Sequence, residues 1–202
     1  MTTEEVKADC YSAGERDWML ATQRWREQAL EPLLKSLVRV QVTPNGLTLL
    51  SLLVGLAFCP LWLVSRPAAM AALVMHVLLD GLDGPLARFT RVASRRGSFT
   101  DTMADQIVVT GVTITLMTTG TVGIVPGGAY VFLYTLVVAF AMIRNALAVP
   151  YSWLVRPRFI IYAWLLVETY AWPGSLGWLL WGFNALLTWK VLTGFRRIRA
   201  EL

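Results

Sequence analysis

Four aspartates are the only acidic residues between Glu31 and Glu168. They are Asp80, Asp83, Asp101 and Asp105. The flanking sequence is apolar enough for a membrane, where an ionised carboxylate costs about 3 kcal/mol. Carboxylates gathered there need a compensating cation, and oxygen ligands favour a hard ion such as Mg²⁺, Mn²⁺ or Ca²⁺ over zinc. The pattern therefore predicts a divalent-metal site inside a helical membrane protein.

The spacing places the aspartates on two neighbouring helices. Asp80 and Asp83 are three residues apart, and Asp101 and Asp105 are four apart, so each pair shares one helix face. The short connection between them predicts antiparallel helices that carry all four carboxylates at a similar depth. Small residues and a phosphate-pairing arginine lie beside them, namely Gly84, Ala87, Arg88 and Gly97. Together these residues indicate a substrate with a phosphate or pyrophosphate group.

The composition places this 202-residue chain in the membrane class, with 56% hydrophobic and only 15% charged residues. Soluble domains carry about 25% charged residues. The chain is long enough for about six spans of roughly 20 residues each, with no room for a separate soluble domain. The expected spans are 44–65, 68–90, 97–119, 127–149, 157–172 and 176–195. The predicted fold class is an all-α integral membrane protein with six transmembrane helices preceded by an amphipathic interfacial helix.

The expected organisation has three parts. Residues 1–13 form a polar tail, 14–42 an amphipathic juxtamembrane helix, and 43–202 a six-helix transmembrane catalytic domain. The amphipathic helix either lies in the membrane interface or packs across the cytoplasmic ends of the bundle, and the two are compatible. Thr43 is the expected N-cap of the first span, with Pro44 in its first turn. We expect no cleavable signal peptide and no disulfide framework.

The basic residues predict the orientation. One side of a six-span topology holds the N-terminal helix and the arginines near residues 91–96, 156–158 and 196–199, whereas the other side holds Arg66 alone. By the positive-inside rule both termini and the active site face the cytoplasm, in the cytoplasmic membrane. The net charge of +5 is therefore a topology signal. A nucleic-acid partner is not expected, because no soluble basic face exists.

The aspartate segment resembles the signature of the CDP-alcohol phosphotransferase family. The residues read D-x-x-D-G-x-x-A-R, eight further residues, then G-x-x-x-D-x-x-x-D, without one departure. Thr43-Pro44-Asn45 also looks like the segment that these enzymes carry ahead of the first span. The close resemblance covers about residues 42–106. It implies a membrane enzyme of phospholipid synthesis that transfers a phosphatidyl group from CDP-diacylglycerol to an alcohol and releases CMP.

The resemblance also implies roles for individual residues. Asp80, Asp83, Asp101 and Asp105 would hold Mg²⁺ or Mn²⁺, as two ions, and Asp105 would be the general base. The CDP-linked donor would contact Thr43, Asn45, Gly84, Ala87, Arg88 and Gly97. A homodimer embedded among membrane lipids is likewise implied by resemblance alone.

The acceptor alcohol stays open. Arg144, Arg156 and Arg158 are candidates for an acceptor phosphate, as in users of glycerol 3-phosphate or inositol phosphate, although positive-inside anchoring explains Arg156 and Arg158 equally well. The sequence around Arg144 departs from the segment associated with inositol-phosphate users. The alternative within the family is a CDP-aminoalcohol that donates to diacylglycerol. Outside it, a carboxylate-lined cation transporter would leave Arg88 and the glycines unexplained. A catalytically silent scaffold would give no reason to keep four desolvated charges.

Overall fold

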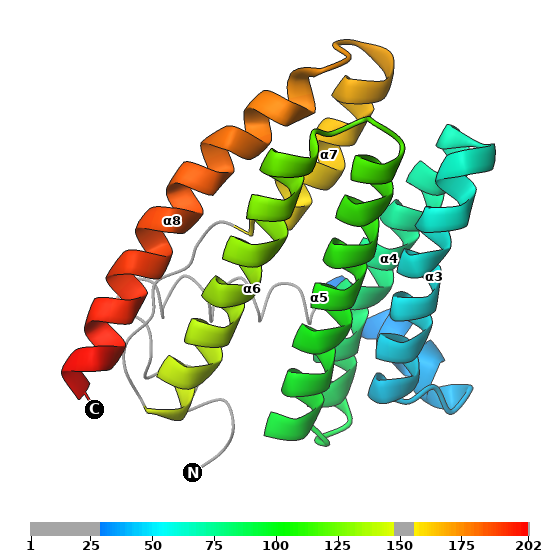
Figure 1. Ribbon diagram of the computed structural model, residues 1–202. Helices are drawn as coiled ribbons and strands as arrows, with labels where there is room; N and C mark the ends of the chain where they lie inside the picture. The colour runs from blue at the N-terminus through cyan, green and yellow to red at the C-terminus, as the bar shows by residue number, and fades with distance from the viewer. Residues whose placement is uncertain (1–28, 148–155, 202) are drawn as a thin grey trace.

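The structure, a computed structural model, describes residues 29–147 and 156–201. Every regular element in that part of the chain is a helix (Figure 1). A helix over residues 29–39 precedes α3 (Pro44–Val64), α4 (Arg66–Phe89), α5 (Arg95–Thr118), α6 (Ile124–Ala146), α7 (Pro157–Tyr170) and α8 (Ser175–Glu201). The predicted tail over 1–13 and the first half of the predicted amphipathic helix lie outside the described residues.

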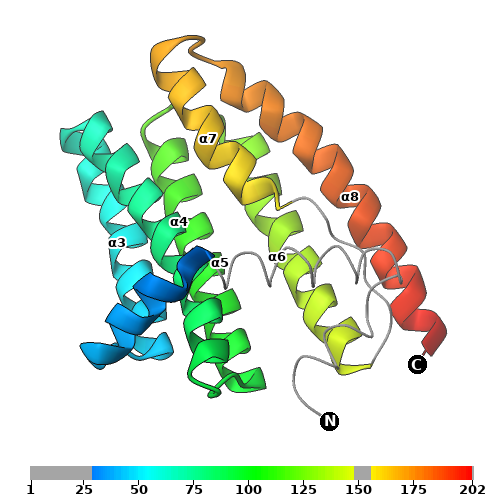
Figure 2. The ribbon, with the colours of Figure 1, turned by 180° about the vertical axis from the view of Figure 1, so that it is seen from behind.

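The helices form two groups around one apolar core. α3 packs on α4 and α5, while α6 and α7 pack on α8, and the groups meet where α5 contacts α6 and α4 contacts α7 (Figures 1 and 2). Phe58, Val108 and Leu187, which are fully buried, belong to this core. A polar contact also joins α8 to α6, because Asn184 Nδ2 donates to the carbonyl of Pro126 at 2.9 Å.

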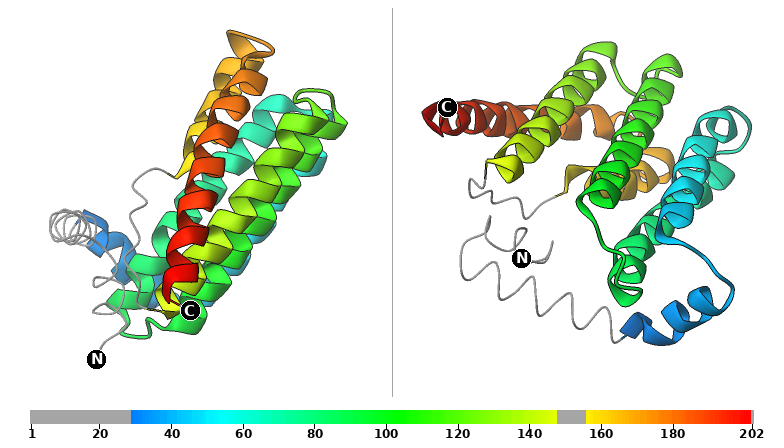
Figure 3. Two further views of the ribbon diagram at one scale, coloured as in Figure 1. Left: turned by 60° about the vertical axis from the view of Figure 1, so that its left-hand side comes forward. Right: turned by 90° about the horizontal axis from the view of Figure 1, so that it is seen from below.

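The helix over residues 29–39 lies across one end of the bundle (Figures 2 and 3). Its Leu34 packs with Leu47 of α3 and Leu86 of α4 in a second, smaller apolar cluster. The helix ends at residue 39 rather than at the predicted 42, because Gln41 takes a left-handed conformation with φ of 58°. The chain then extends into Thr43, as the residue before a proline must.

Side-chain caps set where the first three bundle helices begin. Thr43 accepts a hydrogen bond from Gly46 N–H at 3.1 Å, which confirms it as the N-cap of α3. Ser65 and Ser94 cap α4 and α5 in the same way. All six helices from α3 to α8 start within about three residues of the predicted spans. By contrast, α8 continues to Glu201, past the predicted residue 195, since its basic tail contains no helix breaker.

Three of the described helices are long and apolar enough to cross a membrane: α3, α4 and α6 up to Arg144. α5 carries four charged residues in its first half, and α7 has 14 residues, a length of about 21 Å. A hydrocarbon core is about 30 Å thick, so α7 alone is shorter than a complete span. The fold is thus all-helical with three candidate spans.

α3 and α5 approach closely at Gly55. A Cβ atom added there would lie 2.7 and 2.8 Å from the methyl carbons of Val108 and 3.0 Å from Nδ1 of His76. These neighbours are themselves fixed: Val108 is fully buried, and His76 Nδ1 lies 2.8 Å from the Ser51 hydroxyl. Gly55 therefore sets the spacing between α3 and the two helices that carry the aspartates.

We expect Gly55→Ala to lower the stability of the folded chain by about 1–3 kcal/mol, because the added methyl group overpacks a rigid contact. Gly128→Ala is the matched control, since a Cβ at Gly128 meets nothing within 4 Å. Thermal unfolding in detergent measures both variants. Equal midpoints for the two would show that the close approach at Gly55 is unimportant.

Candidate metal centre

The turn between α4 and α5 brings the aspartates together. Asp80 and Asp83 lie in the last three turns of α4, and Asp101 and Asp105 lie in the first three turns of α5. α4 ends in a tight turn in which Arg91 has a φ of 58° and Val92 N–H donates to the carbonyl of Ala87. The chain reverses there, so both aspartate pairs reach the same level of the bundle.

Three of the four carboxylates form one group. Asp80, Asp101 and Asp105 each offer a carboxylate oxygen, and these three oxygens lie within 4.8 Å of one another. Asp80 and Asp105 also come within hydrogen-bonding reach of each other. Such a group can surround one divalent ion, because Mg²⁺ and Mn²⁺ accept oxygen ligands at about 2.1 Å.

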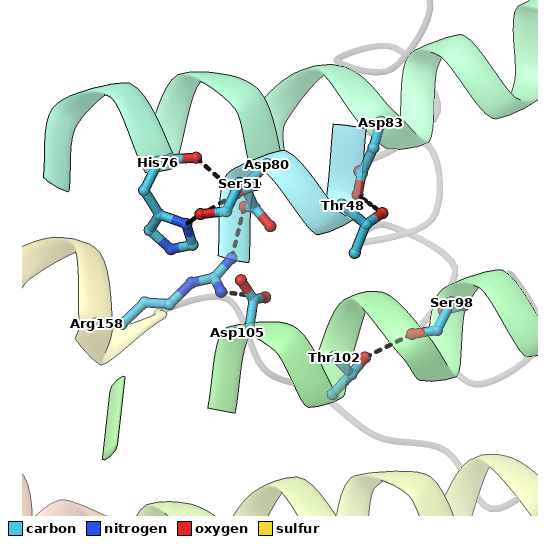
Figure 4. Close-up of polar contacts among 9 residues, drawn as sticks. All are labelled: Thr48, Ser51, His76, Asp80, Asp83, Ser98, Thr102, Asp105 and Arg158. Carbon is cyan, nitrogen blue, oxygen red and sulfur yellow. Dashed lines mark hydrogen bonds and ion pairs between the residues drawn. The ribbon is translucent and has the colours of Figure 1, made fainter. Parts of the chain in front are cut away.

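Asp83 stands beside this group and is held by α3. The Thr48 hydroxyl donates to Asp83 Oδ2 at 2.7 Å, and both side chains are buried (Figure 4). Asp83 lies within hydrogen-bonding reach of Asp101 as well. Hydrogen-bonding reach thus pairs Asp83 with Asp101 and Asp80 with Asp105, and Asp101 also belongs to the group of three with Asp80 and Asp105.

Arg158 of α7 bridges the second pair. Its Nη2 donates to Asp80 Oδ2 at 2.8 Å, and its Nη1 pairs with Asp105 Oδ2 (Figure 4). The Arg158 side chain is 3% exposed, against 9% for Asp80 and 17% for Asp105. The positive charge therefore comes from the other helix group and is withdrawn from solvent.

The donor set fits a divalent metal. Carboxylates that approach one another in a buried site repel unless a proton or a cation lies between them. One guanidinium carries a single positive charge, which offsets one of four carboxylates when all are ionised. The ligands are oxygen atoms alone, and that is the set that Mg²⁺, Mn²⁺ and Ca²⁺ prefer.

The other predicted donor contacts lie around this centre. Gly84 and Ala87 follow Asp83 along α4, and the Arg88 guanidinium passes back along the helix, because its Nη1 would lie 3.5 Å from a Cβ at Gly84. Gly97 lies one turn before Asp101, and its N–H donates to Ser94. At the start of α3, Thr43 and Asn45 are exposed. Their contacts with a donor stay predictions.

The three arginines predicted to bind the acceptor lie in different surroundings. Arg158 lies in the aspartate centre, the site formed by Asp80, Asp83, Asp101 and Asp105. A role in anchoring the chain at the membrane surface does not explain why Arg158 is buried there. Arg144 is also buried, at 5% exposed, near the end of α6. Arg156 is exposed at the start of α7, with its guanidinium 6.0 Å above the ring of Phe159. The structure thus brings one of the three into contact with the aspartates.

Sequence reasoning missed the side chains that α3 contributes. Thr48 holds Asp83, and Ser51 contacts His76, one turn before Asp80. The sequence did contain a sign of these contacts. Thr48 and Ser51 are hydroxyl residues three positions apart in an apolar span, so they share one helix face.

A mostly apolar groove of about 280 Å³ adjoins the centre between α3 and α5. Thr48 links the groove to the aspartates, because its hydroxyl donates to Asp83 and its side chain lines the groove. Leu49, Leu52, Phe99 and Ile107 supply most of the apolar wall.

We expect Thr48→Val to weaken Mn²⁺ binding by tenfold or more, because Asp83 loses the donor that orients it. Thr48→Ser keeps the hydroxyl and should bind Mn²⁺ nearly as the wild type does. Electron paramagnetic resonance of free Mn²⁺ during titration gives both affinities. If valine and serine gave the same affinity, the hydrogen bond would have no part in metal binding.

Comparison with known proteins agrees with this geometry. The chain is 40% identical to an archaetidylinositol phosphate synthase of Aeropyrum pernix over 83 residues, which is 40% of this chain and 43% of that protein. It is 39% identical to a CDP-diacylglycerol–serine O-phosphatidyltransferase of Mycobacterium tuberculosis over 71 residues, 35% of this chain and 25% of that one. The chain thus spans less than half the length of these curated relatives in the matched regions.

Solved structures share the fold. Phosphatidylinositol phosphate synthase of M. tuberculosis, in complex with manganese and citrate, superposes with a TM-score of 0.69 and 19% identity, over 83% of this chain and 87% of that one. The same protein with CDP-DAG bound gives a TM-score of 0.63 at 20% identity, over 83% and 92% of the two chains. The family model described as CDP-alcohol phosphatidyltransferase matches residues 41–193, which include every residue of the aspartate centre. This chain is a member of the CDP-alcohol phosphatidyltransferase family.

Proposed function

We propose that this chain transfers a phosphatidyl group from CDP-diacylglycerol to an alcohol and releases CMP. The observation that carries the proposal is the set of carboxylate oxygens from Asp80, Asp101 and Asp105 within 4.8 Å of one another, inside the family signature. An oxygen-only site on helices that also carry small residues and Arg88 suits a nucleotide diphosphate with bound divalent ions.

In the reaction, the acceptor oxygen forms a bond with the phosphorus of the phosphatidyl group. The bond from that phosphorus to the CMP oxygen breaks, and CMP leaves with the bonding electrons. Asp105 would take the acceptor proton as general base, while Asp80, Asp83 and Asp101 would hold Mg²⁺ or Mn²⁺, as two ions, with Asp105 also helping at the second ion. Bound there, such ions would supply positive charge against the pyrophosphate and the leaving group.

The donor would lie with its nucleotide diphosphate along Gly84, Ala87, Arg88 and Gly97, with Thr43 and Asn45 at the entrance. Its acyl chains suit the apolar groove between α3 and α5, which begins at Thr48. The acceptor would approach from the α6 and α7 side, where Arg158 reaches the centre and Arg144 and Arg156 lie on the same two helices. An acceptor that carries a phosphate group suits these arginines best.

The membrane arrangement is part of the proposal. Six transmembrane helices, with α5, α7 and α8 added to the three candidate spans, would form the 43–202 catalytic domain. The helix that includes residues 29–39 would lie in the cytoplasmic interface. Both termini and the aspartate centre would face the cytoplasm, on the side rich in arginine, and the chain would act as a homodimer in the cytoplasmic membrane.

Purified protein in lipid should release CMP from CDP-diacylglycerol only when Mg²⁺ or Mn²⁺ and a suitable alcohol are present. The acceptor panel comprises glycerol 3-phosphate, inositol phosphate and serine, with a parallel arm of CDP-aminoalcohol plus diacylglycerol. Activity in that arm alone would reverse the roles of donor and acceptor. The proposed transferase activity is contradicted if none of these mixtures releases CMP in a metal-dependent way.

We expect Asp105→Asn to reduce transfer by at least a hundredfold, because the amide cannot take the acceptor proton. Donor binding, measured by equilibrium dialysis of CDP-diacylglycerol in detergent, should persist. Glu31→Gln makes the same chemical change at an exposed residue paired with Lys35, and it should retain activity. Parallel loss of donor binding and transfer in Asp105→Asn would instead assign Asp105 to the metal alone.

A further inference from the structure

The aspartate centre contains a cation of its own in one of its two halves. Arg158 bridges Asp80 and Asp105, whereas Asp83 and Asp101 lie together on the side that Thr48 supports. The two carboxylate pairs are therefore not equivalent. An ion that enters beside Asp83 and Asp101 meets two acidic groups, but an ion at the other pair meets a guanidinium already in place.

Arg158 is well placed to compete with an ion for that pair. Both terminal nitrogens of its planar fork are engaged with the carboxylates, a geometry that matches two carboxylate oxygens closely. A divalent ion that uses Asp80 and Asp105 would lie within a few ångströms of the same guanidinium. Like charges at that separation repel strongly in a buried site.

The neighbourhood of Arg158 offers the guanidinium another place. Tyr162 lies one turn further along α7, and its buried hydroxyl has no hydrogen-bond partner among the described residues. The same holds for Arg158 Nε and for the hydroxyl of Tyr130 on α6. A tyrosine oxygen accepts a hydrogen bond from an arginine N–H. The hydroxyls of Tyr130 and Tyr162 can therefore accept hydrogen bonds from the guanidinium when it leaves the carboxylates.

We propose that Arg158 is a built-in counter-cation that a second divalent ion must displace from Asp80 and Asp105. The inference rests on the proposed metal role of the aspartates and deepens it. In the ion-poor state the guanidinium offsets one negative charge of the pair and stays paired with Asp105. Displacement separates Asp105 from the guanidinium and turns Arg158 toward α6, on the side from which the acceptor would approach.

Displacement also couples the second ion to an anion. A buried guanidinium that loses its carboxylates needs a new negative partner, because an unpaired buried charge is unfavourable. A phosphate group beside α7 would supply that partner, whether it belongs to the acceptor or to the donor. The second ion and the phosphate should therefore strengthen each other's binding, as linkage requires.

Mn²⁺ titration of the full chain, followed by electron paramagnetic resonance, tests the proposal without a turnover measurement. The wild type should bind one ion tightly and a second ion more weakly. Arg158→Gln should bind the second ion at least tenfold more tightly, because the competing charge is gone. Arg156→Gln, which removes an exposed charge two residues away, should leave both affinities within about twofold.

Arg158→Lys is the second variant. It gives an independent test of the proposal if Arg158→Gln does not fold. Lysine keeps the charge but cannot bridge both carboxylates, so the second ion should bind a few times more tightly than in the wild type. Inorganic phosphate should tighten the second ion in the wild type more than in Arg158→Gln. CDP-diacylglycerol and glycerol 3-phosphate, added separately, then distinguish a donor phosphate from an acceptor phosphate.

Three results would overturn the proposal. The first is an unchanged or weaker second affinity in folded Arg158→Gln, which would make Arg158 an organiser of the site. The second is a lysine variant equal to the wild type, which would leave only a long-range charge effect. The third is a single bound ion in both the wild type and Arg158→Gln. Absence of any Mn²⁺ binding to the wild type would instead contradict the proposed metal-dependent function itself.

Discussion

The mutual repulsion of four carboxylates in an apolar bundle is the constraint on which the rest of the structure depends. Asp80, Asp83, Asp101 and Asp105 meet where α4 turns into α5, and three of them offer oxygens within 4.8 Å of one another. A bundle cannot gather these groups without positive charge, since each ionised carboxylate loses hydration there. Arg158 supplies part of that charge, and a divalent ion is the natural source of the remainder.

Close contacts between the surrounding helices hold the four carboxylates in place. Gly55 lets α3 approach α4 and α5 closely, and Thr48 of α3 reaches Asp83 of α4. α7 packs on α8 and also contacts α4, and its Arg158 reaches Asp80 and Asp105. On the far side, Glu168 closes the turn from α7 to α8 by accepting the N–H groups of Gly174 and Leu176 at 2.6 and 2.7 Å. The polar contacts thus tie together helices whose other contacts are apolar.

The sequence was most informative where the chemistry is local. The spacing of the aspartates predicted their helix faces and their meeting at one level, and Thr43 was identified as a cap from its place before Pro44. Contacts between distant segments were not predictable in this way. Thr48 reaches a residue 35 positions away, and Arg158 reaches one 78 positions away, so neither contact follows from a local pattern. Arg158 was therefore grouped with Arg156, although one is buried and the other exposed. The hydropathy of α7 suggested a full span, but its helical length is 14 residues.

The central claim is that the aspartates hold the metal against the phosphates of a CDP-linked lipid. Electron–nuclear double resonance at phosphorus, recorded on Mn²⁺-loaded protein with CDP-diacylglycerol, tests this contact directly. We expect a phosphorus hyperfine coupling typical of a phosphate oxygen bound to Mn²⁺, and we expect its loss when Asp80 is replaced by asparagine. Mn²⁺ that binds the aspartates but shows no coupling to phosphorus in the presence of bound donor would contradict the account.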